Sequence, residues 1–351
     1  MFRMGAVVLT MVLLVVSACT FSQREIEDPG WTTIALPDAL PRTLAVDGNR
    51  VLVAGERGRY APAAWIVGRS VTTVVLRPHS PYGPTADLVA ATLSGDTVAF
   101  AGQRPGGAHG IPRWTIWAGT VSGGADDLPQ TFETFGGPDS LGLVGLQTVA
   151  GKPLLLGNWA DGQPGPAFWR ASGTRWARVP STLAGFLASG MGVSRGRPVV
   201  VGHSTTGGSL RPTVWLGAPD LRSWRALPLG NAPVARALDL SCAGPTCLVV
   251  VRTPGTGVAV WEVGGTAREL PTPKMARDAE WAQVSAGPDG GRAVAFGSSE
   301  RSVFCYWKAD GWRYAVPPVG VVRDLATVGN RFVAIVGDGE QESSPRALVT
   351  T

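Results

Sequence analysis

Short apolar runs recur along most of the chain, and glycine, proline or polar turn residues bound each of them. Seven runs share one form, four to six consecutive small or apolar positions: 51–55, 98–102, 154–157, 199–202, 248–251, 293–297 and 332–337. Runs of this length between turn residues are typical of buried strands. Six of them end in glycine, which predicts a positive φ where the backbone leaves the strand. The fifth run differs, with Arg252 in that place.

Each apolar run belongs to a longer repeat. A polar-flanked strand precedes it, a strand with tryptophan follows, and a last strand often ends in Leu-Pro or Val-Pro. The recurring tryptophans are 52 or 46 residues apart: Trp65, Trp117, Trp169, Trp215, Trp261 and Trp307. A period of this length predicts four-stranded units around a central axis. We therefore expect an all-β fold, a seven-bladed β-propeller, in which these tryptophans pack between blades and are not a sugar-stacking platform.

The two ends of the chain complement each other. The phrase at residues 31–36, Trp-Thr-Thr-Ile-Ala-Leu, matches the fourth strand of other repeats, while residues 346–351 match only a third strand. We expect residues 31–36 to supply the outer strand of the last blade and so to close the ring. This predicts one domain over residues 31–351.

The first 19 residues have the plan of a secretory signal. Arg3 precedes an apolar run over 6–16 that is too short to span a bilayer as a stable anchor. The run ends in Val-Ser-Ala-Cys19, which resembles the bacterial lipobox. That resemblance implies diacylation of Cys19, whereas the alternative is an ordinary signal with a chance cysteine. Residues 20–30 are then a solvated tether of at most roughly 40 Å.

Net charge and composition limit the kinds of partner and the source that the sequence suggests. The net charge is +5, and about +4 without Arg3, so it argues only weakly for an acidic partner. An extracytoplasmic position makes nucleic acid an improbable target. Arginine greatly outnumbers lysine, and alanine, glycine, valine and proline are abundant, as in high-GC bacteria such as actinobacteria.

The cysteines fit an oxidising compartment. Cys242 and Cys247 bracket the turn sequence Ala-Gly-Pro-Thr between two apolar strands, so they are placed to form a disulfide across a hairpin. A reduced pair is the alternative. Cys305 lies in an apolar strand and is expected to be a small buried hydrophobic residue, with a reactive thiol as the other reading.

The longer loops should share one face of the ring. They are the loops between second and third strands and the connections between blades, and binding residues on scaffold folds concentrate in such loops. The turns on the opposite face are short and leave little room for a site. The candidate ligand or partner contacts in the long loops are Tyr60, His79, Tyr82, Arg104, His109, Arg113, Trp159, Asp161, His203 and Arg211.

The histidines and the charged residues at the start of inner strands are two further candidate sites. The three histidines come from different repeats without ligand spacing, so solvated loop histidines are expected and no metal or cofactor is predicted. Several inner strands begin with a charged residue that could form a ring at the channel mouth: Arg42, Asp87, Arg236, Glu280 and Arg323. The alternative for these residues is pairing between arginine and aspartate of adjacent blades.

The period and the tryptophan phrases resemble bacterial β-propeller lipoproteins, of actinobacterial type, over nearly all of the mature chain. Sialidase Asp-boxes, the vicinal cysteines of quinone enzymes, hydrolase triads and phosphate loops are missing from the sequence. We therefore expect a membrane-anchored, non-catalytic binding or scaffolding module on the extracytoplasmic face, with an envelope protein as its partner. The alternative is a cell-wall glycan-binding or glycan-active protein, with Trp159 and Tyr82 stacking on sugar and Asp161 or Asp87 as a carboxylate.

Overall fold

The structure is a computed structural model that describes eleven stretches of the chain: 27–58, 60–106, 112–160, 162–172, 175–204, 210–232, 234–272, 279–298, 302–309, 311–337 and 345–350. Cys19, His109 and Asp161 lie outside the described residues. Within these stretches, no helix is long and apolar enough to cross a membrane.

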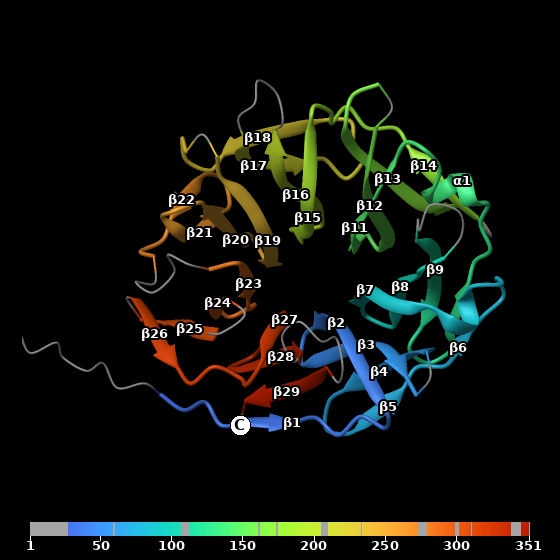
Figure 1. Ribbon diagram of the computed structural model, residues 1–351, viewed down its shortest axis with the longest axis horizontal. Coiled ribbons are helices and arrows are strands. Elements are labelled where there is room, and N and C mark those ends of the chain that lie inside the picture. The colour runs from blue at the N-terminus through green and yellow to red at the C-terminus, as the bar shows by residue number, and fades with distance from the viewer. Residues whose placement is uncertain are drawn as a thin grey trace, which may run out of the picture.

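Seven antiparallel sheets stand around a central axis like the blades of a propeller (Figure 1). This confirms the predicted all-β, seven-bladed β-propeller. From the axis outwards, the first three blades contain β2 (Ala39–Asp47), β3 (Arg50–Arg57), β4 (Ala61–Val67) and β5 (Val71–Thr73); β7 (Asp87–Ser94), β8 (Thr97–Arg104), β9 (Arg113–Thr120) and β10 (Gly124–Asp127); and β11 (Ser140–Val149), β12 (Lys152–Trp159), β13 (Gly165–Ser172) and β14 (Arg175–Val179).

The remaining four blades follow the same order. They contain β15 (Phe186–Ser194), β16 (Arg197–Ser204), β17 (Arg211–Gly217) and β18 (Trp224–Pro228); β19 (Arg236–Ala243), β20 (Thr246–Thr253), β21 (Gly257–Val263) and β22 (Ala267–Glu269); β23 (Trp281–Ala286), β24 (Arg292–Gly297), β25 (Ser302–Lys308) and β26 (Gly311–Ala315); and β27 (Val321–Val328), β28 (Arg331–Gly337), β29 (Arg346–Thr350) and β1 (Trp31–Thr33).

Three short elements lie in the connections between blades. Strand β6 (Leu76–Arg77) adds a parallel fifth strand to the second blade, beside β10. The 3-10 helix η1 (Gly83–Thr85) leads into β7, and α1 (Phe132–Phe135) lies between the second and third blades. These connections shape the long-loop face around the second blade.

The hydrophobic core is divided among the interfaces between blades. Among the described residues, each of the seven interfaces holds one cluster of buried side chains. Trp65, Trp117 and Trp169 are at most 2% exposed, and the three later periodic tryptophans are half-buried against three of the other clusters. A large aromatic on the third strand thus fills the gap between two twisted sheets.

The ends of the chain meet in the last blade. Strand β1 pairs antiparallel with β29, with Trp31 opposite Thr350 and Thr33 opposite Leu348. The amide of Ile34 continues the ladder by donating to the carbonyl of Ala347. In Figure 1 the end of β29 lies beside the start of β1 at the outer rim.

Six of the seven inner strands contain a β-bulge. The register shifts at Arg42 in β2 and at Arg323 in β27, for example, and at the matching positions of β7, β11, β15 and β19. At a bulge two residues face one residue of the partner strand, which bends the strand and redirects a side chain. The residue after the bulge is Asp239 in β19 and Asp324 in β27.

The bulges also explain three glycines of the second strands. The positive φ predicted for these glycines was wrong. Gly55, Gly157 and Gly202 lie inside β3, β12 and β16, and none of them has a positive φ. A Cβ on Gly202 would lie 2.1 Å from the carbonyl oxygen of Leu187, and one on Gly55 would lie 2.2 Å from that of Leu40. Glycine is needed because the bulged inner strand approaches this backbone closely.

Candidate functional site

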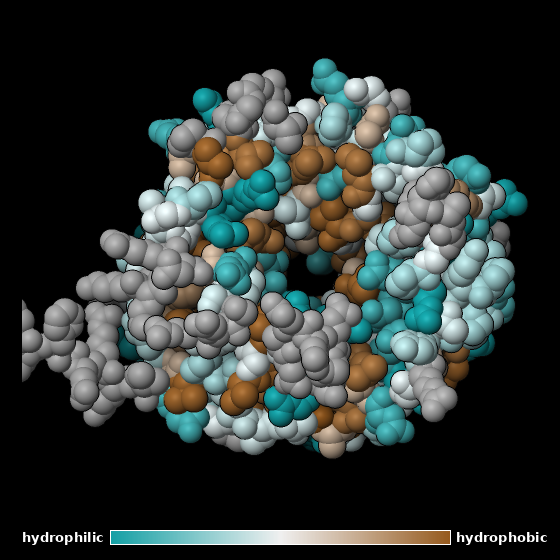
Figure 2. Space-filling view, in the orientation of Figure 1, coloured by the Kyte–Doolittle hydropathy of each residue, from teal (hydrophilic) through white to brown (hydrophobic). Residues whose placement is uncertain are grey.

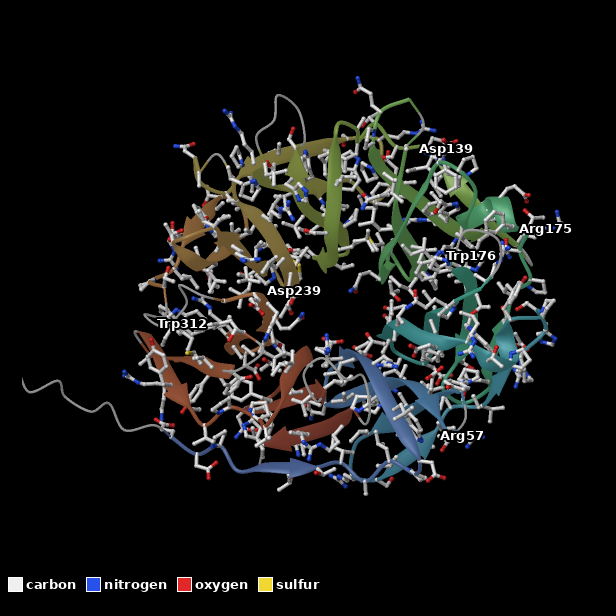
Figure 3. The ribbon with its side chains drawn as sticks, in the orientation of Figure 1. Arg57, Asp139, Arg175, Trp176, Asp239 and Trp312 are labelled. Carbon is white, nitrogen blue, oxygen red and sulfur yellow. A yellow bond between two sulfur atoms is a disulfide. The ribbon has the colours of Figure 1, made fainter. Side chains whose placement is uncertain are left out.

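The inner strands surround a central channel. They line a cavity of about 650 Å³, and its opening is visible at the centre of the ring in Figure 2. Asp239 lies at the inner edge of the ring, beside this opening (Figure 3). Asp239 and Asp324 are the only acidic side chains among the described lining residues, apart from Asp47 at a turn.

Both channel aspartates are bound to the next blade. Asp239 Oδ2 accepts the amide of Val284 at 2.9 Å, and Asp324 Oδ2 accepts the amide of Leu44 at 2.7 Å and the hydroxyl of Thr43 at 3.2 Å. Burial raises the pKa of Asp239. Burial, with the charge of Asp239 as a smaller cause, raises the pKa of Asp324 to about 7. These carboxylates therefore fasten adjacent blades to each other.

The predicted channel-rim residues divide into separate contacts. Arg42 Nε lies 3.2 Å from Asp87 Oδ2, which joins the first blade to the second. Arg236 lies close enough to His203 for its charge to contribute to the lowered pKa of that histidine, after burial. Glu280 and Arg323 are exposed, before β23 and within β27. The pairing of Arg42 with Asp87 is the alternative that the sequence left open.

The long-loop face carries a groove between the second and third blades. It has a volume of about 300 Å³, and three segments form its walls: Ser80–Tyr82 before β7, Pro112–Trp114 at the start of β9, and Asp127–Gly136 around α1. In Figure 1 these segments lie at the right-hand edge of the ring, around β6, β9 and α1.

One wall of the groove contains a fully buried carboxylate. Asp127 is 0% exposed, and its Oδ2 accepts the amide of Ser80 at 2.9 Å and the hydroxyl of the same serine. Gly83 is required here, because a Cβ would lie 2.4 Å from Oδ2. Within the described structure, Asp127 Oδ1 has no hydrogen-bond partner. A buried polar atom without a partner costs stability, unless a ligand or water supplies the missing hydrogen bond.

Arginine and aromatic rings form the rest of the groove. The guanidinium of Arg113 lies 4.2 Å from the ring centre of Phe132 and 5.9 Å from that of Tyr82. Tyr82 is 43% exposed and Phe132 is 38% exposed, so both rings face solvent over much of their surface. Arg113 Nε is buried and has no partner among the described residues. Exposed aromatics beside an arginine are the residue types most enriched at binding hot spots.

A second pair of this kind lies nearby on the same face. The guanidinium of Arg104, at the end of β8, is 4.5 Å from the ring centre of Tyr60, in the long loop of the first blade. The two pairs place four of the residues predicted from sequence, Tyr60, Arg104, Tyr82 and Arg113, in arginine–aromatic contacts over the first two blades.

The predicted position of Trp159 was wrong. It is the last residue of β12, opposite Gly165, and does not lie in a loop. Its ring packs edge-to-face on Trp169 with centroids 5.9 Å apart, and the guanidinium of Arg178 lies 5.4 Å from its centre. The strand continues past Gly157 because this glycine does not form a turn. It allows the backbone of β11 to approach closely.

His79, His203 and Arg211 do not line this groove. His79 Nε2 is 2.9 Å from Asp126 Oδ1, and Arg77 binds the same carboxylate and is the first cause of its pKa falling to about 2. His203 is the penultimate residue of β16, and Arg211 begins β17 as an exposed residue. Among the described residues, no group of three histidine, cysteine or acidic side chains could hold a metal ion.

Three components of the groove were not predicted from the sequence: Ser80, Asp127 and Phe132. Asp127 belongs to an Asp-Asp-Leu-Pro phrase that looks like an ordinary strand end. Its importance depends on the distant Ser80 meeting it across a connection between blades, and no local pattern signals that meeting.

Comparison with solved structures bears on the fold. The chain is similar to YCF48 bound to D1 peptide, with 13% identity, a TM-score of 0.59, and coverage of 94% of this chain and 99% of that one. It is also similar to the WD40 β-propeller domain of Doa1, with 10% identity, a TM-score of 0.53, and coverage of 91% and 97%.

A third similar structure is the β-propeller domain of the Trilobed protease from Pyrococcus furiosus, with 11% identity, a TM-score of 0.52, and coverage of 84% and 90%. At these identities the likeness establishes the β-propeller fold alone. No protein-family model matches the chain, and no curated protein sequence matches it.

Proposed function

We propose that this protein is a membrane-tethered binding module whose long-loop face docks a segment of an envelope protein. The groove between the second and third blades carries the proposal. It combines solvent-facing aromatic rings, the Arg113 guanidinium and the buried Asp127, whose Oδ1 has no hydrogen-bond partner among the described residues. These groups can receive an apolar side chain and hydrogen-bonding backbone of an extended segment at the same place.

The similar structures support a protein ligand. Two of them are a propeller bound to a peptide and a WD40 propeller domain, and propellers are commonly protein-binding modules. No residue of those proteins is transferred to this chain. The proposal rests on the groove of this molecule, and the neighbours support only the class of ligand.

The membrane tether is the second part of the proposal. The lipobox ending at Cys19 supports diacylation, and two acyl chains are enough for stable anchoring. Intact-mass measurement of the protein purified from bacterial membranes tests this directly. A diacylglyceryl mass on a chain beginning at Cys19 is expected, and an unmodified chain cleaved elsewhere would reject the anchor.

A glycan ligand has less support. The ring of Trp159 is covered by Trp169 on one side and approached by Arg178 on another, and Asp87 is engaged by Arg42. Among the stacking residues expected for a sugar, Tyr82 alone keeps a largely exposed ring among the described residues.

Cross-linking in intact cells, followed by mass spectrometry, tests the docking site. Wild-type protein is compared with an Arg113→Ala/Phe132→Ala variant, which removes both members of the closest arginine–aromatic contact. One reproducible envelope partner is expected for the wild type, and its cross-link should fall by about tenfold or more in the variant, as for a hot-spot loss of about 1.4 kcal/mol or more.

The matched control is Arg331→Ala/Val71→Ala. It removes an exposed arginine and an exposed apolar side chain from the opposite face, and it leaves the groove intact. Near-ultraviolet circular dichroism confirms that both variants keep their tertiary packing. An unchanged partner cross-link in the groove variant, or wall glycan recovered in place of a protein, would reject the proposed function.

A further inference from the structure

A second hollow opens on the face opposite the long loops. It lies between the fourth and fifth blades, has a volume of about 990 Å³, and is walled by the turns that join β15 to β16, β17 to β18, β19 to β20 and β21 to β22. The sequence predicted too little room for a site on this face. Each turn is indeed short, but the space lies between two blades and not within a turn.

The charged side chains among the described residues that line this hollow are all basic. Arg195, Arg197 and Arg225 line it, and all three are exposed. The described lining residues include no aspartate or glutamate, and in the described part of the chain none of the three arginines forms a salt bridge. A concave surface with several unneutralised guanidinium groups attracts an anion.

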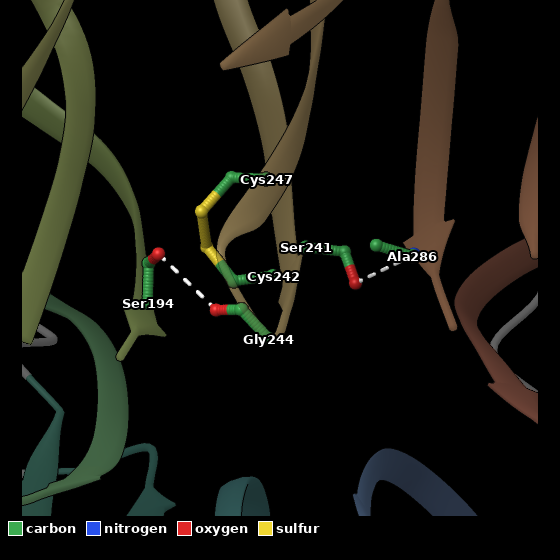
Figure 4. The surroundings of a disulfide bond; sticks show 6 residues. All are labelled: Ser194, Ser241, Cys242, Gly244, Cys247 and Ala286. Atoms are coloured by element: carbon green, nitrogen blue, oxygen red, sulfur yellow. Dashed lines mark hydrogen bonds between the residues drawn. A yellow bond between two sulfur atoms is a disulfide. The ribbon is translucent and has the colours of Figure 1, made fainter. Parts of the chain in front are cut away.

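The disulfide holds one wall of the hollow in place. Cys242 and Cys247 close the turn that contains Gly244, and the carbonyl of Gly244 accepts the hydroxyl of Ser194 at 3.2 Å (Figure 4). The same carbonyl accepts the amide of Arg195 at 3.2 Å. The backbone of this arginine is therefore fixed to the neighbouring blade through a covalently closed turn, which positions the cationic wall before any ligand arrives.

We infer that this basic hollow binds the phosphate headgroup of an anionic phospholipid. The planar guanidinium group presents paired N–H donors that match phosphate oxygens. A tether of at most roughly 40 Å keeps the ring within reach of the headgroup layer. The inference takes the tether from the proposed function, and it is independent of the long-loop groove.

Native mass spectrometry of the full-length protein in non-ionic detergent tests the inference. Short-chain phosphatidylglycerol and phosphatidylcholine are titrated separately, and glycerol phosphate represents a soluble source of the same group. The wild type should bind phosphatidylglycerol more tightly than the other two. An Arg197→Gln/Arg225→Gln variant should bind it roughly thirtyfold more weakly, since each basic residue at an anionic surface contributes about fivefold in affinity.

The matched control is Arg69→Gln/Arg331→Gln. Both arginines are exposed on the same face, and neither lines the hollow. A control variant that keeps wild-type affinity supports the assignment to this hollow. An equal loss in both variants, or equal binding of the two phospholipids, would overturn it. Equal affinity for glycerol phosphate would overturn the lipid assignment in favour of a soluble phosphate ester.

The same spectra separate this inference from the tether. The mass of the protein shows whether Cys19 carries acyl chains, whatever lipid is bound. An acylated protein that does not retain phosphatidylglycerol would overturn the headgroup site and keep the anchor. A protein that lacks acyl chains and still retains the lipid would support the site while rejecting the anchor.

Discussion

Asp239 and Asp324 show how single residues replace a missing strand. An inner strand pairs with another strand along one edge only, so the backbone N–H groups on its other edge face the channel. Each aspartate follows a β-bulge, and its carboxylate accepts such an N–H group from the next blade. The hydrogen bonds are gained at the cost of burying two carboxylates that interact with each other, which raises their pKa values.

Stability should therefore depend on pH through Asp324. Its pKa is about 7 in the folded protein, and an unfolded aspartate titrates near its usual value of about 3.9. Between these values the folded state binds a proton that the unfolded state does not. This contribution to stability is thus fully present below about pH 4 and is lost as the pH rises through about 7.

Urea unfolding at several pH values tests this expectation. The Asp324→Asn variant should show a shallower fall in unfolding free energy between about pH 5 and 8 than the wild type. Asp126→Asn is the control, because the pKa of Asp126 is about 2 and the residue stays ionised over that range. Identical slopes for wild type and Asp324→Asn would contradict the expectation.

At the scale of the strand, the glycines of the second strands allow the bulged inner strands to pack closely. The Gly202→Ala variant tests this role. Its new Cβ would lie 2.1 Å from a backbone carbonyl oxygen, which cannot move without breaking the ladder. We expect a loss of about 3 kcal/mol in unfolding free energy, measured by urea denaturation.

Gly264→Ala is the matched control for that experiment. The nearest atom to its added Cβ is 3.7 Å away, and the residue lies in a turn without a positive φ. Its unfolding free energy should stay within about 0.5 kcal/mol of the wild type. A similar small effect for Gly202→Ala would show that the inner strand relaxes away from the added methyl group.

The hairpin between β19 and β20 carries the disulfide, which the sequence had predicted. Cys242 and Cys247 are five positions apart, so the bond closes a small loop. In the chain-entropy account a loop of this size stabilises the folded state by about 2 kcal/mol. Urea denaturation of the Cys242→Ala/Cys247→Ala variant should show a loss of about that size in unfolding free energy. A reductant should lower the unfolding free energy of the wild type and leave that of the variant unchanged.

The buried thiol of Cys305 provides an internal check on that experiment. It is 0% exposed, and burial raises its pKa to about 12. A thiol reagent should therefore leave it unmodified in the folded protein. Labelling of Cys305 under the reducing conditions would show that reductant had opened the sixth blade and not only the disulfide.

The sequence predicted the strands better than the sites. Apolar runs and spaced tryptophans repeat, so they specify four-stranded blades and their number. The bulges themselves need no particular side chain, and their trace in the sequence, the recurring glycine of the second strand, looks the same as a glycine at a strand end. For this reason the channel role of Asp239, the strand position of Trp159 and the buried pair of Ser80 with Asp127 emerged only from the structure.

At the scale of the whole molecule, Trp31 joins the outer strand of the last blade to its neighbour. Its indole N–H donates to the carbonyl of Val316 at 2.9 Å, and its ring meets Phe304 with centroids 5.3 Å apart. Trp31→Ala should lower the unfolding free energy by about 3 kcal/mol, whereas Trp31→Phe should keep most of the packing. Urea unfolding measures both values.

Hydrogen exchange distinguishes a local from a ring-wide effect of that change. If β1 locks the ring, Trp31→Ala should reduce the protection of amides in β28 and β29 together with those of β1. Loss of protection confined to residues 31–34 would show that the other six blades hold the circle closed without this strand.

The pairing of β1 with β29 joins residues 317 positions apart, as between Thr32 and Val349. An exported chain emerges with β1 first, and this strand has no partner until the last residues arrive. Until β1 pairs with it, β29 is an open sheet edge. At high local concentration, β1 of one copy can complete the last blade of another, so crowding during folding favours strand-exchanged dimers. The six blades between the two ends would be the same in the dimer and in the single ring.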